Sequence, residues 1–184
     1  PVYINNDANC FAIGEKYFGQ GKEFSDLAGV TLGSGLGAGL VIDNKLYTGK
    51  NCGAGEFGSL PYKEGIVEQY CSGQFFPAYG GCSGLHCYIK AVNGDKEAVE
   101  LFNEFGVHLG NAMINILYSF DPEAIILGGA VSDSFDLFKD SMWRTIGSFP
   151  YKRTVDGLVV VRSSVEHSAV LGAAALCYDK WNNK

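Results

Sequence analysis

The composition of this 184-residue chain, with 47% hydrophobic and 18% charged residues, is typical of a folded globular protein and excludes a disordered one. Its net charge of −6 and pI near 5.0 argue against nucleic acid or an anionic membrane surface as the main partner. No apolar run approaches the roughly 18 residues that a membrane-spanning helix requires.

The first predicted elements are a strand at residues 2–4 and a helix that begins near Phe11 and ends near Gly19. A strand that starts directly after Pro1 suggests a cut through a longer protein. Between strand and helix lies the polar run Asn-Asn-Asp-Ala-Asn at residues 5–9. Asn and Asp at such a junction usually cap the helix, but one cap explains only one of these four polar side chains.

Four glycines at alternate positions, from Gly33 to Gly39, lie between predicted strands. The strands of this region are expected at residues 30–32, 40–42 and 46–48. Alternate glycines remove the side chains from one face, so another group can approach the backbone closely. Exposed backbone N–H groups, together with the hydroxyl of Ser34, suit a phosphate group. The alternative is a glycine-rich hairpin that packs against a neighbouring element.

Two glutamates follow the glycine-rich hairpin. Glu56 lies in a run of small residues, where a carboxylate is not expected for packing, although an exposed surface turn would also explain it. A loop is predicted at residues 61–65 and a helix at residues 66–74. Glu68 falls near the start of that helix, where an acidic side chain complements the helix dipole without any further role.

The cluster Cys82, His86 and Cys87 invites comparison with a metal site. Closed zinc sites have four ligands, commonly with a CxxC-type pair, and neither the fourth ligand nor this spacing is present. We therefore expect no metal here. The other cysteines fall mostly in helix-like segments of a well-supplied core, which favours free thiols in a reducing cytoplasm over disulfides.

The second half of the chain alternates helices and strands. The predicted elements are a long helix from Asp95 to Phe120, a strand at 123–127, a helix at 135–146, a strand at 158–161 and a helix at 168–181. His108 lies beside the apolar stripe of the long helix and is expected to be a packed or boundary histidine. Hairpin strands first and strand–helix alternation afterwards predict an α/β domain with a mixed sheet and helices packed on it.

These motifs, taken together and in this order, resemble the ROK family of sugar kinases and related repressors. The matching segments are NDAN at residues 6–9, GSGLGAG at 33–39, GAGEFG at 53–58, EQYCSG at 68–73 and PEAIILGGAV at 122–131. The resemblance implies an actin-like ATPase (ribonuclease-H-like) lobe with a five-stranded mixed sheet. It implies further that residues 1–184 form the C-terminal lobe of a two-lobed kinase whose N-terminal lobe is absent from this chain.

The resemblance also implies roles for individual residues in moving the γ-phosphate of Mg-ATP to a hexose hydroxyl. Asp7 matches the catalytic base of the family, which must accept the proton of a poorly nucleophilic hydroxyl. The residues that match sugar ligands are Asn6, Glu56, Ser59 and Glu68. The residues that match the nucleotide site are Gly33, Ser34 and Gly35 in the second phosphate loop, and Gly128 and Gly129 beside the adenosine.

Three departures from the family pattern stand out. Ser59 replaces a histidine, and residues 60–67 replace a zinc-binding cysteine run, so we expect no structural zinc. Both changes remove zinc ligands, and the lost histidine normally also contacts the sugar. The first phosphate loop, of the DxGGT type, is absent from the chain as well. We therefore expect this fragment to be inactive as a kinase by itself.

The resemblance is compatible with three hypotheses about function. The first is a hexose kinase of the glucokinase or N-acetylhexosamine kinase type, located in the cytoplasm, for which the family's frequent dimerisation allows a homodimer. The second is the sugar-sensing domain of a ROK-type transcriptional repressor, in which this lobe contacts no nucleic acid. The third is an inactive actin-like scaffold. The presence of both Asp7 and a glycine-rich loop favours the kinase, because a sensor of sugar alone has no use for a phosphate cradle.

Overall fold

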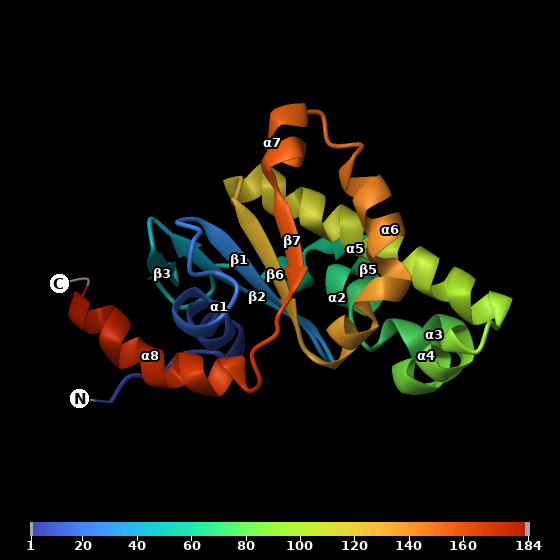
Figure 1. Ribbon diagram of the computed structural model, residues 1–184, viewed down its shortest axis with the longest axis horizontal. Helices are drawn as coiled ribbons and strands as arrows, with labels where there is room; N and C mark the ends of the chain where they lie inside the picture. The colour runs from blue at the N-terminus through green and yellow to red at the C-terminus, as the bar shows by residue number, and fades with distance from the viewer. Residues whose placement is uncertain (1, 183–184) are drawn as a thin grey trace.

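The computed structural model describes residues 2–182, which fold around one mixed five-stranded sheet with the order β3-β2-β1-β6-β7 (Figure 1). Its strands are β1 (Leu27–Leu32), β2 (Leu36–Ile42), β3 (Lys45–Tyr47), β6 (Ala124–Gly128) and β7 (Val159–Arg162). The first three strands are antiparallel to one another, whereas β6 runs parallel to β1 and β7 runs parallel to β6. The mixed sheet predicted from the sequence is confirmed.

Eight α-helices lie in the described part of the chain. They are α1 (Asp7–Phe18), α2 (Val67–Cys71), α3 (Phe75–Gly80), α4 (Gly84–Val92), α5 (Lys96–Phe120), α6 (Phe135–Ile146), α7 (Lys152–Gly157) and α8 (Ser168–Asn182). Two 3-10 turns, η1 (Phe57–Ser59) and η2 (Ala130–Ser134), and a small hairpin of β4 (Pro61–Tyr62) and β5 (Gly65–Ile66) complete the fold.

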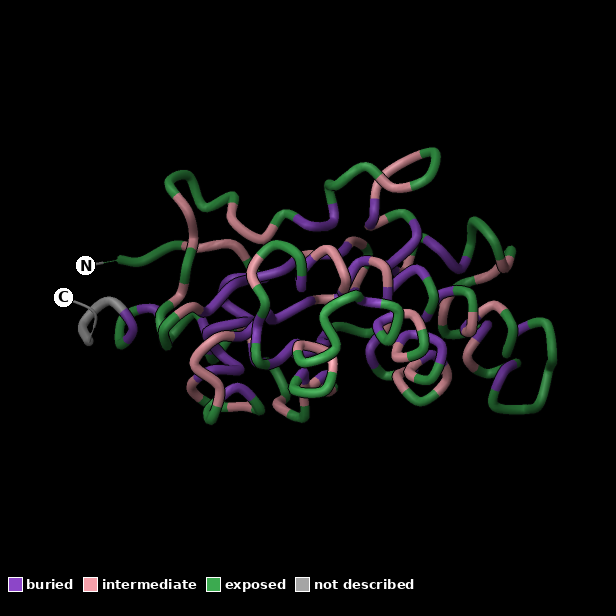
Figure 2. The backbone as a smooth tube through the Cα atoms, turned by 90° about the horizontal axis from the view of Figure 1, so that it is seen from above, coloured by how far each residue is buried: buried purple, intermediate pink, exposed green. Residues whose placement is uncertain are grey.

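The sheet separates two hydrophobic cores, because successive side chains of a strand point to opposite faces. On β6, Ile125 and Leu127 belong to the larger core with α5 and α6, whereas Ala124 and Ile126 belong to the smaller core with α1 and α8. All of β6 is buried, as its uninterrupted apolar sequence predicts. Figure 2 shows buried segments in the middle of the molecule, with exposed segments around them.

Helices α1 and α8 lie side by side on one face of the sheet (Figure 1) and approach each other through glycines. A methyl group at Gly14 of α1 would overlap the backbone carbonyl of Ser168, and one at Gly172 of α8 would overlap the carbonyl of Cys10. The two backbones are therefore in direct contact. This contact fixes α1, which carries Asp7 in its first turn.

Three predictions about local structure are wrong. Residues 2–4 form no strand but are exposed, with Ile4 88% accessible, since no described strand pairs with them. Residues 61–66 form the β4–β5 hairpin rather than a loop. The helix expected at 66–74 ends at Cys71, and α3 begins separately at Phe75. The helices α3, α4 and α7 are short and were not predicted.

His108 is packed inside the larger core, as expected, and is only 3% exposed. Its Nδ1 lies 2.9 Å from the hydroxyl of Tyr62, and its Nε2 lies 3.5 Å from Oε1 of Glu104. The rings of Tyr70 and Phe75 contact the imidazole from other sides. Burial lowers the pKa of His108 below its ordinary value of 6.5, Lys63 lowers it further, and Glu104 opposes both.

This lowered pKa predicts a pH-dependent stability. Between the folded and the unfolded pKa values, the unfolded chain binds more protons at His108, so the free energy of unfolding decreases as the pH falls below about 6.5. The expected slope reaches at most about 1.4 kcal/mol per pH unit. Urea unfolding between pH 7.5 and 5.5 measures it. His108→Gln should flatten the slope, whereas His86→Gln, at an exposed histidine, should keep it. Equal slopes in all three proteins would contradict this assignment.

Candidate active site

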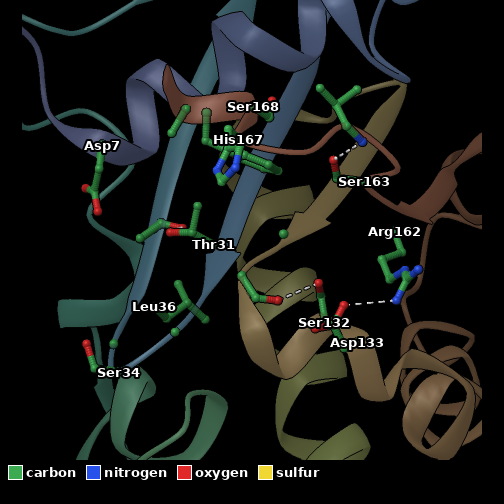
Figure 3. Close-up of a pocket in the computed structure, with 18 of the residues that line it drawn as sticks. Asp7, Thr31, Ser34, Leu36, Ser132, Asp133, Arg162, Ser163, His167 and Ser168 are labelled. Carbon is green, nitrogen blue, oxygen red and sulfur yellow. Dashed lines mark hydrogen bonds and ion pairs between the residues drawn. The ribbon is translucent and has the colours of Figure 1, made fainter. Parts of the chain in front are cut away.

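A cavity of about 890 Å³ lies at the edge of the sheet where the three parallel strands end (Figure 3). Strands β1, β6 and β7 all run in one direction, so the loops after Leu32, Gly128 and Arg162 meet at this edge. The first turn of α1 and the start of α8 also line the cavity. In open α/β sheets this edge is where ligands usually bind.

Asp7 is the residue of α1 that lines this cavity from the first turn of the helix, and it is exposed (Figure 3). Its Oδ1 accepts a hydrogen bond of 2.9 Å from the N–H of Ala8. The helix cap is Asn6, whose Oδ1 accepts a 2.7 Å hydrogen bond from the N–H of Asn9. Capping therefore accounts for Asn6, which does not line the cavity, and leaves Asp7 without that structural role.

The loop from Gly33 to Gly35 forms the turn between β1 and β2 and lines the same cavity. Its carbonyl groups are held by the segment after α2. Gly73 N–H donates to Gly33 O at 2.7 Å, and Gln74 Nε2 donates to Ser34 O at 2.9 Å. In a trans peptide the N–H points opposite to the C=O, so the N–H groups of Ser34 and Gly35 point away from that segment.

The glycines of this hairpin serve two different purposes. A Cβ atom at Gly33 would meet no atom within 4 Å, so this position is open. A Cβ atom at Gly39 would overlap the backbone of α1 at Ala8 and Asn9, and one at Gly37 would press on the Cβ of Ala8. Gly37 and Gly39 thus let α1 pack closely on β2, as expected for a glycine-rich hairpin that packs against a neighbouring element. Gly33 and Gly35 border the cavity.

Of the predicted sugar ligands, Glu68 lines the cavity, whereas Glu56 and Ser59 do not. Oε2 of Glu68 lies 3.4 Å from the N–H of Leu36, and a Cβ at Gly35 would lie 2.6 Å from the same oxygen. Glu56 precedes η1 and is exposed, as is Ser59. Asp7 and Glu68 are therefore the two predicted carboxylates that the structure brings to the cavity.

The turn after β6 brings Gly128 and Gly129 to the cavity wall. Gly129 has a φ of +83°, and a Cβ there would lie 2.5 Å from Leu32 O, so both the backbone angle and the space favour glycine. A second hollow, of about 740 Å³, shares Gly33 and Ser34 with the cavity. It is mainly apolar, with Phe76, Pro77, Leu85, Tyr88 and Val131 among its lining residues.

Several polar residues that line the cavity were not predicted as site residues from the sequence. Arg162, at the end of β7, donates to Oδ1 of Asp133 at 3.0 Å, across the cavity from Asp7 and Ser34 in Figure 3. His167, just before α8, has a φ of +55° and also lines the cavity. Ser163 donates to the buried Glu15 at 2.6 Å and so ties the loop after β7 to α1. For Arg162 and Ser163, the position directly after a predicted strand was the only available signal.

Among residues 2–182, no group of three or more His, Cys, Asp or Glu side chains is arranged to hold a metal ion. The six cysteines are free thiols in the structure. In the described part of the chain, no helix combines the length and apolarity that crossing a membrane would require.

Comparison with known proteins identifies relatives of both expected kinds. A family model described as the ROK family matches residues 1–180. A glucokinase from Streptomyces coelicolor is 32% identical over 190 residues, with 85% of this chain and 58% of the relative covered. A xylose repressor from Bacillus subtilis is 28% identical, with 97% and 51% covered. The chain thus spans only a little more than half the length of these relatives.

The solved structures agree with the sequence comparison. A ROK family glucokinase from Streptomyces griseus, solved in complex with glucose and AMPPNP, is 31% identical and superimposes with a TM-score of 0.80 over 96% of this chain and 68% of its own. The actin-like ATPase fold expected from the motifs is therefore confirmed, together with the mixed five-stranded sheet. On the extent of the family match and these similarities, the chain belongs to the ROK family.

Proposed function

We propose that this chain is the C-terminal lobe of a hexose kinase that transfers the γ-phosphoryl group of ATP to a sugar hydroxyl. The observation that carries the proposal is that one cavity is bordered by Asp7, the open glycine turn at Gly33 and the Gly128–Gly129 turn. A carboxylate beside a phosphate cradle is the minimum that such a transfer requires. The similarity to a glucokinase over 85% of the chain supports it.

In this proposal Asp7 acts as the general base. Its carboxylate accepts the proton of the sugar hydroxyl as that oxygen forms a bond to the γ-phosphorus and the bond from the γ-phosphorus to the ADP oxygen breaks. Asp7 lies in the first turn of α1, and the positive end of the helix dipole there interacts favourably with a negative charge. Glu68 contacts the sugar from the cavity wall. Asn6 at the cap of α1, and Glu56 and Ser59 at η1, contact it from outside that wall. Carboxylates suit a ligand whose polar groups are mostly O–H donors.

The nucleotide is assigned to the two connected hollows. The N–H groups of Ser34 and Gly35 donate to phosphate oxygens, and the apolar hollow beside Val131 and Tyr88 takes the adenine ring. Gly128 and Gly129 allow the adenosine to lie close to the backbone. Mg²⁺, held by the phosphate oxygens of the nucleotide, would supply positive charge against the charge on those oxygens. The proposal includes no structural zinc, because Ser59 and the cysteine-free residues 60–67 provide no set of zinc ligands.

The proposal is tested with the full-length parent and with this chain, each assayed for ATP-dependent phosphorylation of glucose, N-acetylglucosamine and N-acetylgalactosamine. We expect turnover of at least one hexose by the parent and none by the 184-residue chain, because the opposing wall of the cleft and the first phosphate loop are missing. Sugar binding without turnover by the parent would contradict the kinase assignment. Phosphorylation by the isolated chain would contradict the two-lobe assignment.

Gly33→Ala tests the phosphate cradle in the parent enzyme. The added methyl group meets no protein atom within 4 Å, so folding should be unaffected, but it occupies space at the proposed phosphate site. We expect KM for ATP to rise about tenfold or more, which corresponds to about 1.4 kcal/mol of binding, with KM for the hexose nearly unchanged.

Gly157→Ala is the matched control for the cradle variant, because a Cβ atom there also meets nothing within 4 Å and the position lies in α7, away from the cavity. It should leave both KM values unchanged. A Gly33→Ala enzyme with normal KM for ATP would show that this turn is not part of the nucleotide site.

A sugar-sensing repressor is the second candidate, favoured by the similarity to a xylose repressor over 97% of the chain. The repressor needs the sugar contacts of Glu68 but neither the base nor the cradle. An N-terminal DNA-binding segment in the parent, together with absent turnover in the assay above, would support this candidate.

A further inference from the structure

Two cysteine side chains lie in contact at the turn between α3 and α4. The sulfur atoms of Cys82 and Cys87 are 2.7 Å apart. Ser83 caps α4, with its Oγ accepting a 3.3 Å hydrogen bond from His86 N–H, and Cys87 N–H donates to Ser83 O at 2.9 Å. This capped first turn directs the side chain of Cys87 back to Cys82. A disulfide of about 2.05 Å therefore requires only a small movement of the two sulfur atoms.

A small cavity of about 150 Å³ is lined by both cysteines, with Lys90, Asp95 and Leu101 among the other lining residues. The two cysteines are not equally accessible. Cys82 is partly exposed, whereas Cys87 is only 1% exposed. Burial, and next the hydrogen bond with Cys82, raise the pKa of the Cys87 thiol to about 12, with Lys90 opposing this rise. An external reagent therefore meets Cys82 first, and Cys87 is placed to react with whatever forms on Cys82.

We propose that Cys82 and Cys87 form a reversible intramolecular disulfide when the protein meets a low-molecular-weight disulfide such as oxidised glutathione. The Cys82 thiolate attacks one sulfur of the reagent, whose S–S bond breaks and releases one thiolate, leaving a mixed disulfide on Cys82. Cys87 then loses its proton to solvent and attacks the Cys82 sulfur, which releases the second thiolate. In total the two cysteines lose two electrons and two protons, and the reagent is reduced to two thiols.

Cys82 and Cys87 lie next to residues that line the apolar hollow described above. Gly84, Leu85 and Tyr88 of α4 line that hollow, and the cysteines flank Gly84 and Leu85 in the sequence. The disulfide would therefore join the turn before α4 to the helix within the wall of the hollow. The inference about the disulfide is independent of the kinase proposal, because it depends only on the two thiols and their access.

The test uses the protein incubated with oxidised glutathione at pH 8, unfolded in acid, alkylated and digested with trypsin. The peptide of residues 64–90 contains Cys71, Cys82 and Cys87 and no internal Lys or Arg. We expect this peptide to carry one alkyl group, on Cys71, and to be two hydrogen atoms lighter at the other two cysteines. Tandem mass spectrometry should place the bond between Cys82 and Cys87. Three alkylated cysteines, or a lasting glutathione adduct on Cys82, would overturn the proposal.

Three variants make the test specific. Cys87→Ser should retain the glutathione adduct on Cys82, because the resolving thiol is gone. Cys82→Ser should leave Cys87 unmodified, since Cys87 is buried. Cys71→Ser, at a buried thiol in α2, should form the disulfide like the unmodified protein. A Cys82→Ser protein in which Cys87 reacts with glutathione as fast as Cys82 does in the unmodified protein would also contradict the proposed order of events.

Discussion

If the proposed kinase function is correct, replacement of Asp7 by Asn in the full-length protein is expected to lower kcat by about 10²–10⁴-fold, the usual contribution of general acid–base catalysis. The amide cannot accept the proton of the sugar hydroxyl at neutral pH. It keeps the size of the side chain and the oxygen that accepts from Ala8 N–H, so KM for the hexose should change little. The measurement is kcat with the best hexose from the panel, together with a thermal melting curve.

Loss of a helix cap would not explain a lower kcat of the Asp7→Asn protein. The cap of α1 is Asn6 rather than Asp7, so the substitution does not remove a cap. Asp43→Asn is the matched control, because Asp43 lies exposed in the turn between β2 and β3 with a φ of +51°, which Asn also tolerates. The control should keep its kcat. An Asp7→Asn enzyme with near-normal kcat and a normal melting temperature would exclude Asp7 as the base.

Gly172→Ala is expected to cause the largest loss of stability among single-methyl additions to α8. The new Cβ atom would overlap the carbonyl carbon and oxygen of Cys10 and lie 2.9 Å from the backbone nitrogen of Gly14. Since all three groups are backbone, no change of side-chain rotamer can relieve the overlap, and α8 must move away from α1. Overpacking of this kind costs about 1–3 kcal/mol, and more where the backbone cannot relax.

Urea unfolding of the 184-residue chain measures this loss. Gly157→Ala is again the control, since its Cβ position is open, and it should be neutral or stabilising by up to about 1 kcal/mol. Equal free energies of unfolding for Gly172→Ala and Gly157→Ala would show that α8 does not rest on α1 as closely as described.

Long elements with regular patterns could be predicted from the sequence for local reasons. Helix α5 has an unbroken apolar stripe, and Asp95 Oδ1 accepts from Ala98 N–H at 3.0 Å, so the helix start predicted at Asp95 is confirmed. Helix α6 was predicted with the bounds that the structure has. Strand β6 was predicted within one residue because a short, wholly apolar run between a proline and two glycines fits a strand covered on both faces.

The failures occur where tertiary contacts decide local structure. Residues 2–4 have a strand-like sequence, but no described strand offers them hydrogen-bond partners. The helix predicted at 66–74 is interrupted because Ser72, Gly73 and Gln74 turn their polar groups toward the carbonyls of Gly33 and Ser34. That contact joins segments about forty positions apart, which no local pattern can indicate.

By itself, the sequence determined the ordered motifs of the ROK family, the long helices and strands, and Asp7, Gly33 and Glu68 as candidate site residues. Only the tertiary structure decided that these residues share a cavity with Arg162 and His167, and that Glu56 and Ser59 do not line it. The physical reason is strand pairing. Parallel alignment of β1, β6 and β7 brings three distant loops to one edge, and the choice of partner depends on packing across the whole sheet.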